Sequence, residues 1–112
     1  MPTAMSFLDH IDYYGMKAEF LGTFLITTIS GLAYSNYLIK ATNIEEFAMA
    51  TGLVYCVFTM SGHLFSNAVY NPALTGVLMV FKKVHWVTGT FFIFGQLLAS
   101  VFGASLIEFF TP

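Results

Sequence analysis

The chain has 112 residues, of which 57% are hydrophobic and only 9% are charged, with a formal net charge of −2. Soluble domains carry about 25% charged residues, so the composition excludes an ordinary soluble domain and indicates an integral membrane protein. The four basic residues are all lysines, too few to form an electrostatic footprint for nucleic acid. The one cysteine, Cys56, lies in an apolar run, and no zinc or haem spacing is present, so we expect no metal and no cofactor.

Residues 1–17 precede the first long apolar stretch. Phe7, Leu8, Ile11 and Tyr14 have the spacing of a short amphipathic helix, so we expect this segment to lie on the membrane interface or to dock on a partner. It lacks the basic region of a signal peptide, and we expect the spans themselves to direct membrane insertion. Residues 18–112 are then one membrane domain.

The first predicted span is Ala18–Ile39, about 22 residues, which is enough to cross roughly 30 Å of hydrocarbon. Lys17 and Lys40 flank it. Glu19, inside the span, is interpreted as a structural hydrogen-bond acceptor. The alternative is a proton or ion site, because charged residues inside a membrane are often functional. Asn43 is expected to cap the next helix.

The second predicted span runs from about residue 47 to residue 60 or a little beyond, since Ser61, Gly62 and Leu64 could extend it. The segment 61–70 that follows is too polar to face lipid. His63, within it, is interpreted as a loop histidine satisfied by the backbone, with a protonation gate as the alternative. A metal site has little support, because His10 and His85 are distant in the sequence.

The tripeptide Asn71-Pro72-Ala73 is the most informative motif. Asn caps helices and Pro favours the first helical position, so a helix is predicted to start here, inside an apolar region. It runs from Pro72 to about Phe81, roughly 15 Å or half a bilayer. Membrane transport proteins use such re-entrant half-helices to build polar sites at the midplane. Asn71 is therefore either a pore-lining donor or a buried helix cap.

The third predicted span is Trp86 to about Phe110, with Trp86 as an interfacial anchor. Gly95, Ala99 and Gly103 are four residues apart and form a stripe for close helix packing. Gln96 is expected to donate or accept an interhelical hydrogen bond. No nucleophile, base and orienting residue occur together, so catalysis is not expected.

The lysines predict an orientation. If the half-helix enters and leaves at one face, Lys17, Lys82 and Lys83 share that face and Lys40 lies on the other. The positive-inside rule then puts the N-terminus on the cytosolic or matrix side. Which membrane holds the chain is left open, the mitochondrial inner membrane included.

Three stretches carry a resemblance to the aquaporins, the major intrinsic protein family. They resemble, in order, the start of the family's first helix, its first pore loop and its third helix. In this sequence they are Ala18-Glu19-Phe20-Leu21-Gly22-Thr23-Phe24, then Ser61-Gly62 with Asn71-Pro72-Ala73-Leu74-Thr75, and Phe94-Gly95-Gln96-Leu97-Leu98-Ala99 with Gly103-Ala104. The resemblance covers about residues 17–110 and corresponds to one N-terminal repeat.

This resemblance implies a role for several residues. Aquaporins have two inverted repeats whose half-helices meet at the pore centre, and Asn71 would donate hydrogen bonds to passing solute there. Glu19 and Gln96 would be structural partners of the pore loop. Two departures stand out: the Ser-Gly pair is about nine residues before Asn71 rather than about four, and His63 directly follows the pair. A second repeat and its filter arginine are expected to be missing.

The predicted fold is an all-α membrane protein with three transmembrane helices and one re-entrant half-helix, half of an aquaporin-like fold. Two functions follow. In one, the chain is a half-channel that needs a second half, from a second copy or a complementary chain, to form a pore for water or small neutral solutes. In the other, it is a non-conducting structural subunit of a larger membrane complex, for example a bioenergetic one. The bilayer and other membrane chains are the expected partners.

Overall fold

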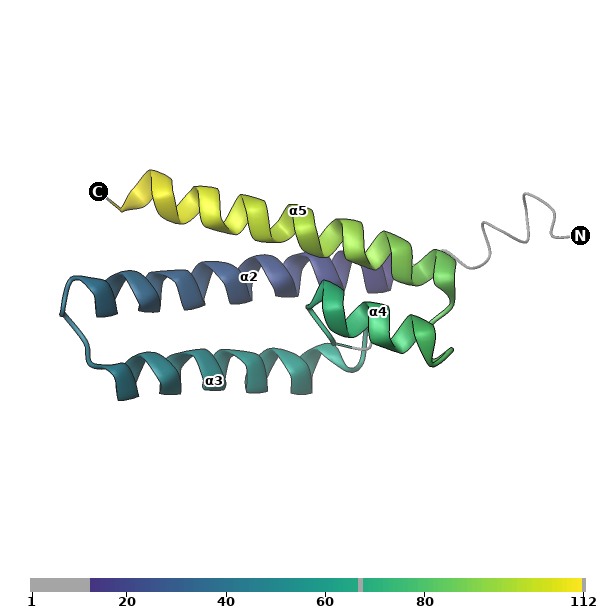
Figure 1. Cartoon of the computed structure of the whole chain (residues 1–112), viewed down its shortest axis with the longest axis horizontal. Coiled ribbons are helices and arrows are strands. Elements are labelled where there is room, and N and C mark those ends of the chain that lie inside the picture. Colours follow the sequence, from purple (N-terminus) through teal and green to yellow (C-terminus); the bar gives the residue numbers. More distant parts are fainter. Residues whose placement is uncertain (1–12, 67, 112) are drawn as a thin grey trace, which may run out of the picture.

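The computed structural model describes residues 13–66 and 68–111, and its regular structure is entirely helical (Figure 1). Within these ranges the elements are α2 (Tyr13–Leu38), α3 (Ile44–Gly62), α4 (Pro72–Val80) and α5 (Trp86–Phe110). Helices α2 and α5 run in the same direction, α3 runs in the opposite direction, and the short α4 covers only part of that length (Figure 1). The prediction of an all-α fold is therefore confirmed.

The helix boundaries lie close to those expected from the sequence. Helix α5 has the predicted bounds, and α4 ends at Val80, one residue earlier than predicted. Helix α2 is helical from Tyr13, the first described residue, and not only from Ala18, because no proline or capping residue directly precedes Ala18 to stop the helix. Of the predicted segment 1–17, residues 1–12 lie outside the described residues.

Asn43 caps α3, as its position predicts. Its side-chain Oδ1 accepts a hydrogen bond of 2.8 Å from the backbone N–H of Glu46. Glu45 and Glu46 stand in the first turn, where the positive end of the helix dipole favours carboxylates. The local sequence therefore specifies where the turn after α2 ends and α3 begins.

Small residues bring α2 and α5 close together. Ala99 is fully buried, and a Cβ added at Gly103 would lie only 3.1 Å from the Cβ of Thr27. At Gly95 the nearest atom to an added Cβ is 4.0 Å away, an ordinary contact with Phe20. The contact is thus tight at Ala99 and Gly103 and looser at Gly95.

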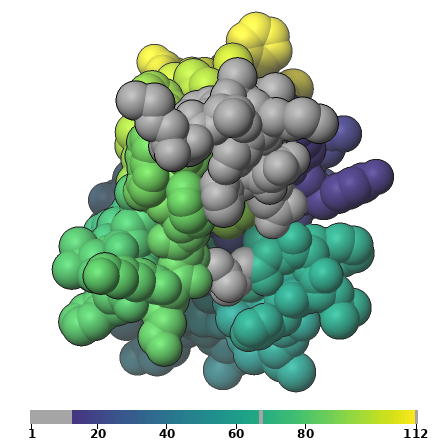
Figure 2. Space-filling model, turned by 90° about the vertical axis from the view of Figure 1, so that its right-hand side faces the viewer, coloured from purple at the N-terminus to yellow at the C-terminus, as the bar shows by residue number. Residues whose placement is uncertain are grey.

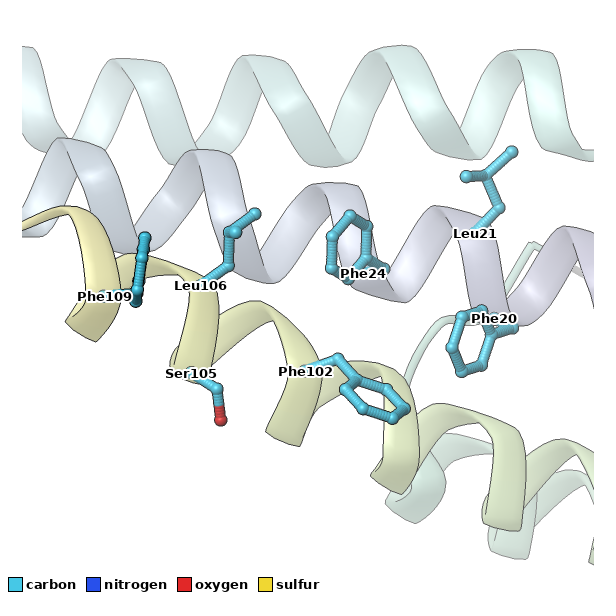
Figure 3. Close-up of a pocket in the computed structure, with 7 residues that line it drawn as sticks. All are labelled: Phe20, Leu21, Phe24, Phe102, Ser105, Leu106 and Phe109. Carbon is cyan, nitrogen blue, oxygen red and sulfur yellow. The ribbon is translucent and has the colours of Figure 1, made fainter.

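An open apolar groove of about 590 Å³ runs between α2 and α5 on the outer surface (Figure 3). Phe20 and Phe102 meet there edge to face, with ring centroids 6.3 Å apart. The hydroxyl of Ser105 points away from the apolar side chains (Figure 3). A surface of this kind fits hydrocarbon better than water.

Helix α5 is, among the described residues, the one helix that is both long and apolar enough by composition to cross a membrane. Helices α2 and α3 have 26 and 19 residues, so they are also long enough. Their polar residues lower their hydropathy, among them Lys17, Glu19 and Asn36 in α2 and Glu45 and Glu46 in α3.

Helix α3 contributes no fully buried residue and leaves one side of the fold open. A second groove, of about 370 Å³, lies between α3 and α4. Its lining is mostly apolar and includes Tyr55, Thr59, Val69, Leu74 and Val77.

Gly103→Ala is expected to destabilise the chain by about 1–2 kcal/mol relative to Gly95→Ala, because the new methyl group overpacks the contact with Thr27. Both variants gain the same helix propensity, about 1 kcal/mol, so their difference isolates packing. Thermal unfolding in detergent micelles, followed by circular dichroism, measures it. Equal stability of the two variants would contradict the close α2–α5 contact.

Candidate functional site

The loop between α3 and α4 (residues 63–71) has an irregular backbone that no helix satisfies. Ala68 and Tyr70 have φ values of 51° and 55°, although neither is glycine. Such conformations cost about 1–3 kcal/mol each and persist only where surrounding contacts hold them. Both residues are only 4% exposed, so residues 68–70 of the loop lie inside the protein and their polar groups need protein partners.

Glu19 of α2 supplies those partners. One carboxylate oxygen, Oε1, accepts hydrogen bonds from the hydroxyl of Ser66 at 2.9 Å and from the backbone N–H of Val69 at 3.1 Å. The other, Oε2, accepts the backbone N–H of Tyr70 at 2.8 Å. A carboxylate accepts on both oxygens at once, so one buried side chain holds three donors of the loop.

Gln96 of α5 joins the same carboxylate to α4. Its Nε2 donates to Glu19 Oε2 at 2.9 Å and to the hydroxyl oxygen of Thr75 at 3.0 Å. The Thr75 hydroxyl in turn donates to the backbone carbonyl of Asn71 at 3.0 Å. Glu19 and Gln96 are 0% exposed and Thr75 is 1% exposed, so the centre of this polar network is buried and its bonds fix where α4 begins.

Tyr70 anchors the α3–α4 loop by inserting its side chain between helices α2 and α3. Its hydroxyl donates to the backbone carbonyl of Phe58 at 2.9 Å. Its ring lies against Gly22 of α2 and its hydroxyl against Gly62 of α3, and a Cβ at either glycine would collide with it. The two glycines therefore create the space that Tyr70 fills.

Asn71 caps α4 and keeps its donors available. Its side-chain Oδ1 accepts the backbone N–H of Ala73 at 2.8 Å, and Pro72 occupies the first turn. Because the oxygen faces the helix, the amide Nδ2 faces away from it. No described residue accepts a hydrogen bond from that nitrogen. Two N–H donors thus project from the positive end of α4.

The structure gathers some of the residues singled out from the sequence and leaves others apart. Glu19 and Gln96 meet in one network beside the Asn71-Pro72-Ala73 turn. His63 instead follows the last residue of α3 with its side chain exposed, and no hydrogen bond links it to the network. Gly95, Ala99 and Gly103 lie on α5, where they face α2.

The hydrogen bonds of three contributors were not predicted from the sequence: those of Ser66, Tyr70 and Thr75. Thr75 carried a usable signal, because a residue four positions after a helix cap lies on the same face as the cap. Tyr70 carried none, since its role depends on glycines in two other helices.

The Ser61-Gly62 pair does not belong to the loop. Both residues lie in α3, and the Ser61 hydroxyl donates to the carbonyl of Val57 within the helix. The apparent excess of residues before Asn71 is therefore the last turn of α3 and the turn after it, residues 61–65.

Ser66 takes the place expected for that serine. Asn71 is four residues after Asn67, so the pair Ser66-Asn67 has the spacing that the resemblance calls for, and Ser66 bonds Glu19. In this register Val69, not His63, stands where the family has its histidine. Glu19 accepts a hydrogen bond from the backbone N–H of Val69, so this contact does not require a particular side chain at position 69. Counted from Ser66, the loop has the length that the resemblance implies. The extra residues appear only when the loop is counted from Ser61.

Across residues 13–66 and 68–111, no three His, Cys, Asp or Glu side chains are grouped so as to hold a metal ion. Cys56 is exposed on α3, with its sulfur 3.8 Å from that of Met60. The chemistry of the site is hydrogen bonding.

Glu19→Gln is expected to destabilise the fold by about 2–4 kcal/mol. The new amide NH₂ would face N–H and O–H donors that the carboxylate accepts, and it would leave at least one of them buried and unpaired. Glu108→Gln, at an exposed position of α5, is the matched control and should be nearly neutral. Thermal unfolding in detergent distinguishes the two. A Glu19→Gln variant as stable as the control would show that the network does not hold the loop.

The geometry agrees with what comparison with known proteins finds. The family model for the major intrinsic proteins matches residues 9–112. Aquaporin-2 of Amblysomus hottentotus is 33% identical over 96 residues, covering 85% of this chain and 87% of that sequence. Aquaporin-2 of Talpa europaea is 36% identical over 97 residues, with the same two coverages.

A plant relative extends the comparison. A probable PIP-type aquaporin of Solanum lycopersicum is 34% identical over 104 residues, covering 83% of this chain but 34% of that protein. The chain likewise matches 35% of the length of Aquaporin-2 from Bos taurus. No solved structure is a significant match. The chain belongs to the major intrinsic protein family and is an integral membrane protein of the channel type.

Proposed function

We propose that this chain forms one half of a transmembrane channel for water or small neutral solutes. In this proposal α2, α3 and α5 cross the membrane and α4 re-enters it from one face. A second half of similar architecture completes the pore. The observation that carries the proposal is the pair of Asn71 N–H donors, which no described residue accepts, at the half-buried start of α4.

The dimensions support this arrangement. The nine residues of α4 span about 14 Å, roughly half of a 30 Å hydrocarbon core. The 19 residues of α3 span about 28 Å, and α2 and α5 are longer. The irregular loop before α4 would be costly in lipid, but Glu19 satisfies it inside the protein.

The donors of Asn71 suit a neutral solute. They lie at the positive end of the α4 dipole, which favours lone pairs and opposes cations. The network from Glu19 through Gln96 and Thr75 to the Asn71 carbonyl fixes their direction before any solute arrives. A solute that accepts these hydrogen bonds replaces part of its hydration without moving the protein.

The open side of the fold supports a second half. Helix α3 buries no residue, and the groove between α3 and α4 begins beside Asn71, at Val69 and Leu74. An apolar helix face that no described residue covers fits either lipid or another helical segment, and the groove beside it would receive the second half in this proposal.

The positions of the lysines indicate whether the second half is another copy of this chain or a different segment. Lys17 stands in the first turns of α2, and Lys82 and Lys83 follow α4, at the same end of the molecule (Figure 1). Two copies of the chain would therefore insert in the same direction, and their short helices would not meet tip to tip. We accordingly propose a complementary half of opposite charge bias, on the same or on another polypeptide.

A non-conducting structural role would need the space before Asn71 to be filled. Among the described residues Tyr70 points between α2 and α3, and Phe65 is 62% exposed, so neither supports that role. It remains one outcome of the following test.

Asn71→Asp is expected to reduce water permeability of vesicles holding the native assembly about tenfold. The aspartate keeps an oxygen to cap Ala73 but removes both amide donors, each worth about 1 kcal/mol. Stopped-flow light scattering measures the permeability at equal protein incorporation, and the same vesicles tested with small neutral solutes define the permeant.

Asn43→Asp is the matched control. Asn43 also caps a helix with its Oδ1, at 2.8 Å from the N–H of Glu46, but lies in the turn between α2 and α3. It should leave permeability unchanged. Permeability that is the same in wild type and Asn71→Asp, or that is no greater than in empty vesicles, would support the structural role and refute the channel.

A further inference from the structure

We propose that the turn between α4 and α5 (residues 81–85), together with Trp86, binds the headgroup of an anionic phospholipid. Lys82 and Lys83 contact the negatively charged headgroup, and Trp86 lies at the boundary between headgroups and hydrocarbon. This proposal concerns the end of the molecule and does not depend on whether the chain conducts.

The charges of the described residues are separated along the molecule. Carboxylates gather at the end where α3 begins and α5 finishes, namely Glu45, Glu46 and Glu108. At the opposite end, where α4 finishes and α5 begins, the one described carboxylate is Glu19, which is buried and holds the loop. Lys82 and Lys83 are both exposed there, and no described carboxylate lies within salt-bridge distance of them.

The backbone of this turn is well defined. The N–H of Lys82 donates to the carbonyl of Met79 at 3.1 Å, and that of Lys83 donates to Leu78 at 2.8 Å. Val84 is only 8% exposed, and its backbone N–H donates to the carbonyl of Leu78 at 3.4 Å. The two lysines are thus presented side by side from a fixed turn at the negative end of the α4 dipole, which favours cations.

The neighbouring side chains indicate a lipid partner. Val80 is 77% exposed, Phe81 69% and Trp86 62%. These apolar groups flank the lysines, and the turn projects at the edge of the end view (Figure 2). Lysines extend toward the membrane surface while their stems and nearby aromatic rings stay in the apolar layer. An acidic soluble peptide would pair with the lysines but would leave the apolar groups in water, so a phospholipid is the better fit.

The charge selects anionic lipids. Each lysine near a membrane surface favours anionic over neutral lipid by roughly fivefold, and salt screens the effect. We therefore expect a severalfold excess of anionic lipid beside Trp86 at low salt.

The single tryptophan makes this measurable, because Trp86 is the only one in the chain. The full chain is reconstituted in nanodiscs of mostly phosphatidylcholine, with an equal minor fraction of either brominated phosphatidylglycerol or brominated phosphatidylcholine. Bromine quenches indole fluorescence at short range. We expect the anionic quencher to reduce Trp86 emission severalfold more effectively than the neutral one, and high salt to remove most of the difference.

The double variant Lys82→Gln with Lys83→Gln should lose most of the wild-type preference, because only Lys17 is left as a described cation at this end, and each single variant should be intermediate. Lys40→Gln, at the opposite end, is the matched control and should keep the wild-type preference. Equal quenching in the wild type, as would follow if Asp9 or Asp12 neutralised the turn, would overturn the proposal. An unchanged preference in the variants, single or double, would do the same.

Discussion

The buried carboxylate of Glu19 is the interaction on which the rest of the structure depends. It accepts hydrogen bonds from Ser66, Val69, Tyr70 and Gln96, which brings α2, the α3–α4 loop and α5 to one point. An ion with no exposed surface is costly unless its oxygens are paired, so the loop and the carboxylate each need the other. This mutual requirement explains how an irregular, non-glycine backbone persists inside an apolar protein.

Packing completes what hydrogen bonding begins. Tyr70 fits between Gly22 and Gly62, and Gly103 lets α5 approach Thr27 of α2. Since interiors are close-packed, a side chain at Gly22 or Gly62 would displace the Tyr70 ring, and one at Gly103 would push against Thr27. The start of α4 is therefore determined by helices on either side of it, and the direction of the Asn71 donors is set by the same contacts.

Local signals allowed much of this to be predicted. The Asn-Pro pair predicts the start of α4, and Asn43 predicts the start of α3, because caps act within one turn. The register of the loop could not be read from short motifs, since Ser61-Gly62 looks right in isolation and only the bond from Ser66 to Glu19 decides. Contacts that join distant helices leave no local pattern.

The central claim is that the donors of Asn71 face a solute path completed by a second half. Electron cryomicroscopy of the native assembly in nanodiscs tests it most directly. The account predicts the start of a second short helix opposite Asn71, with a continuous water-filled path between the two. An Asn71 amide packed against apolar side chains, with no path past it, would contradict the account.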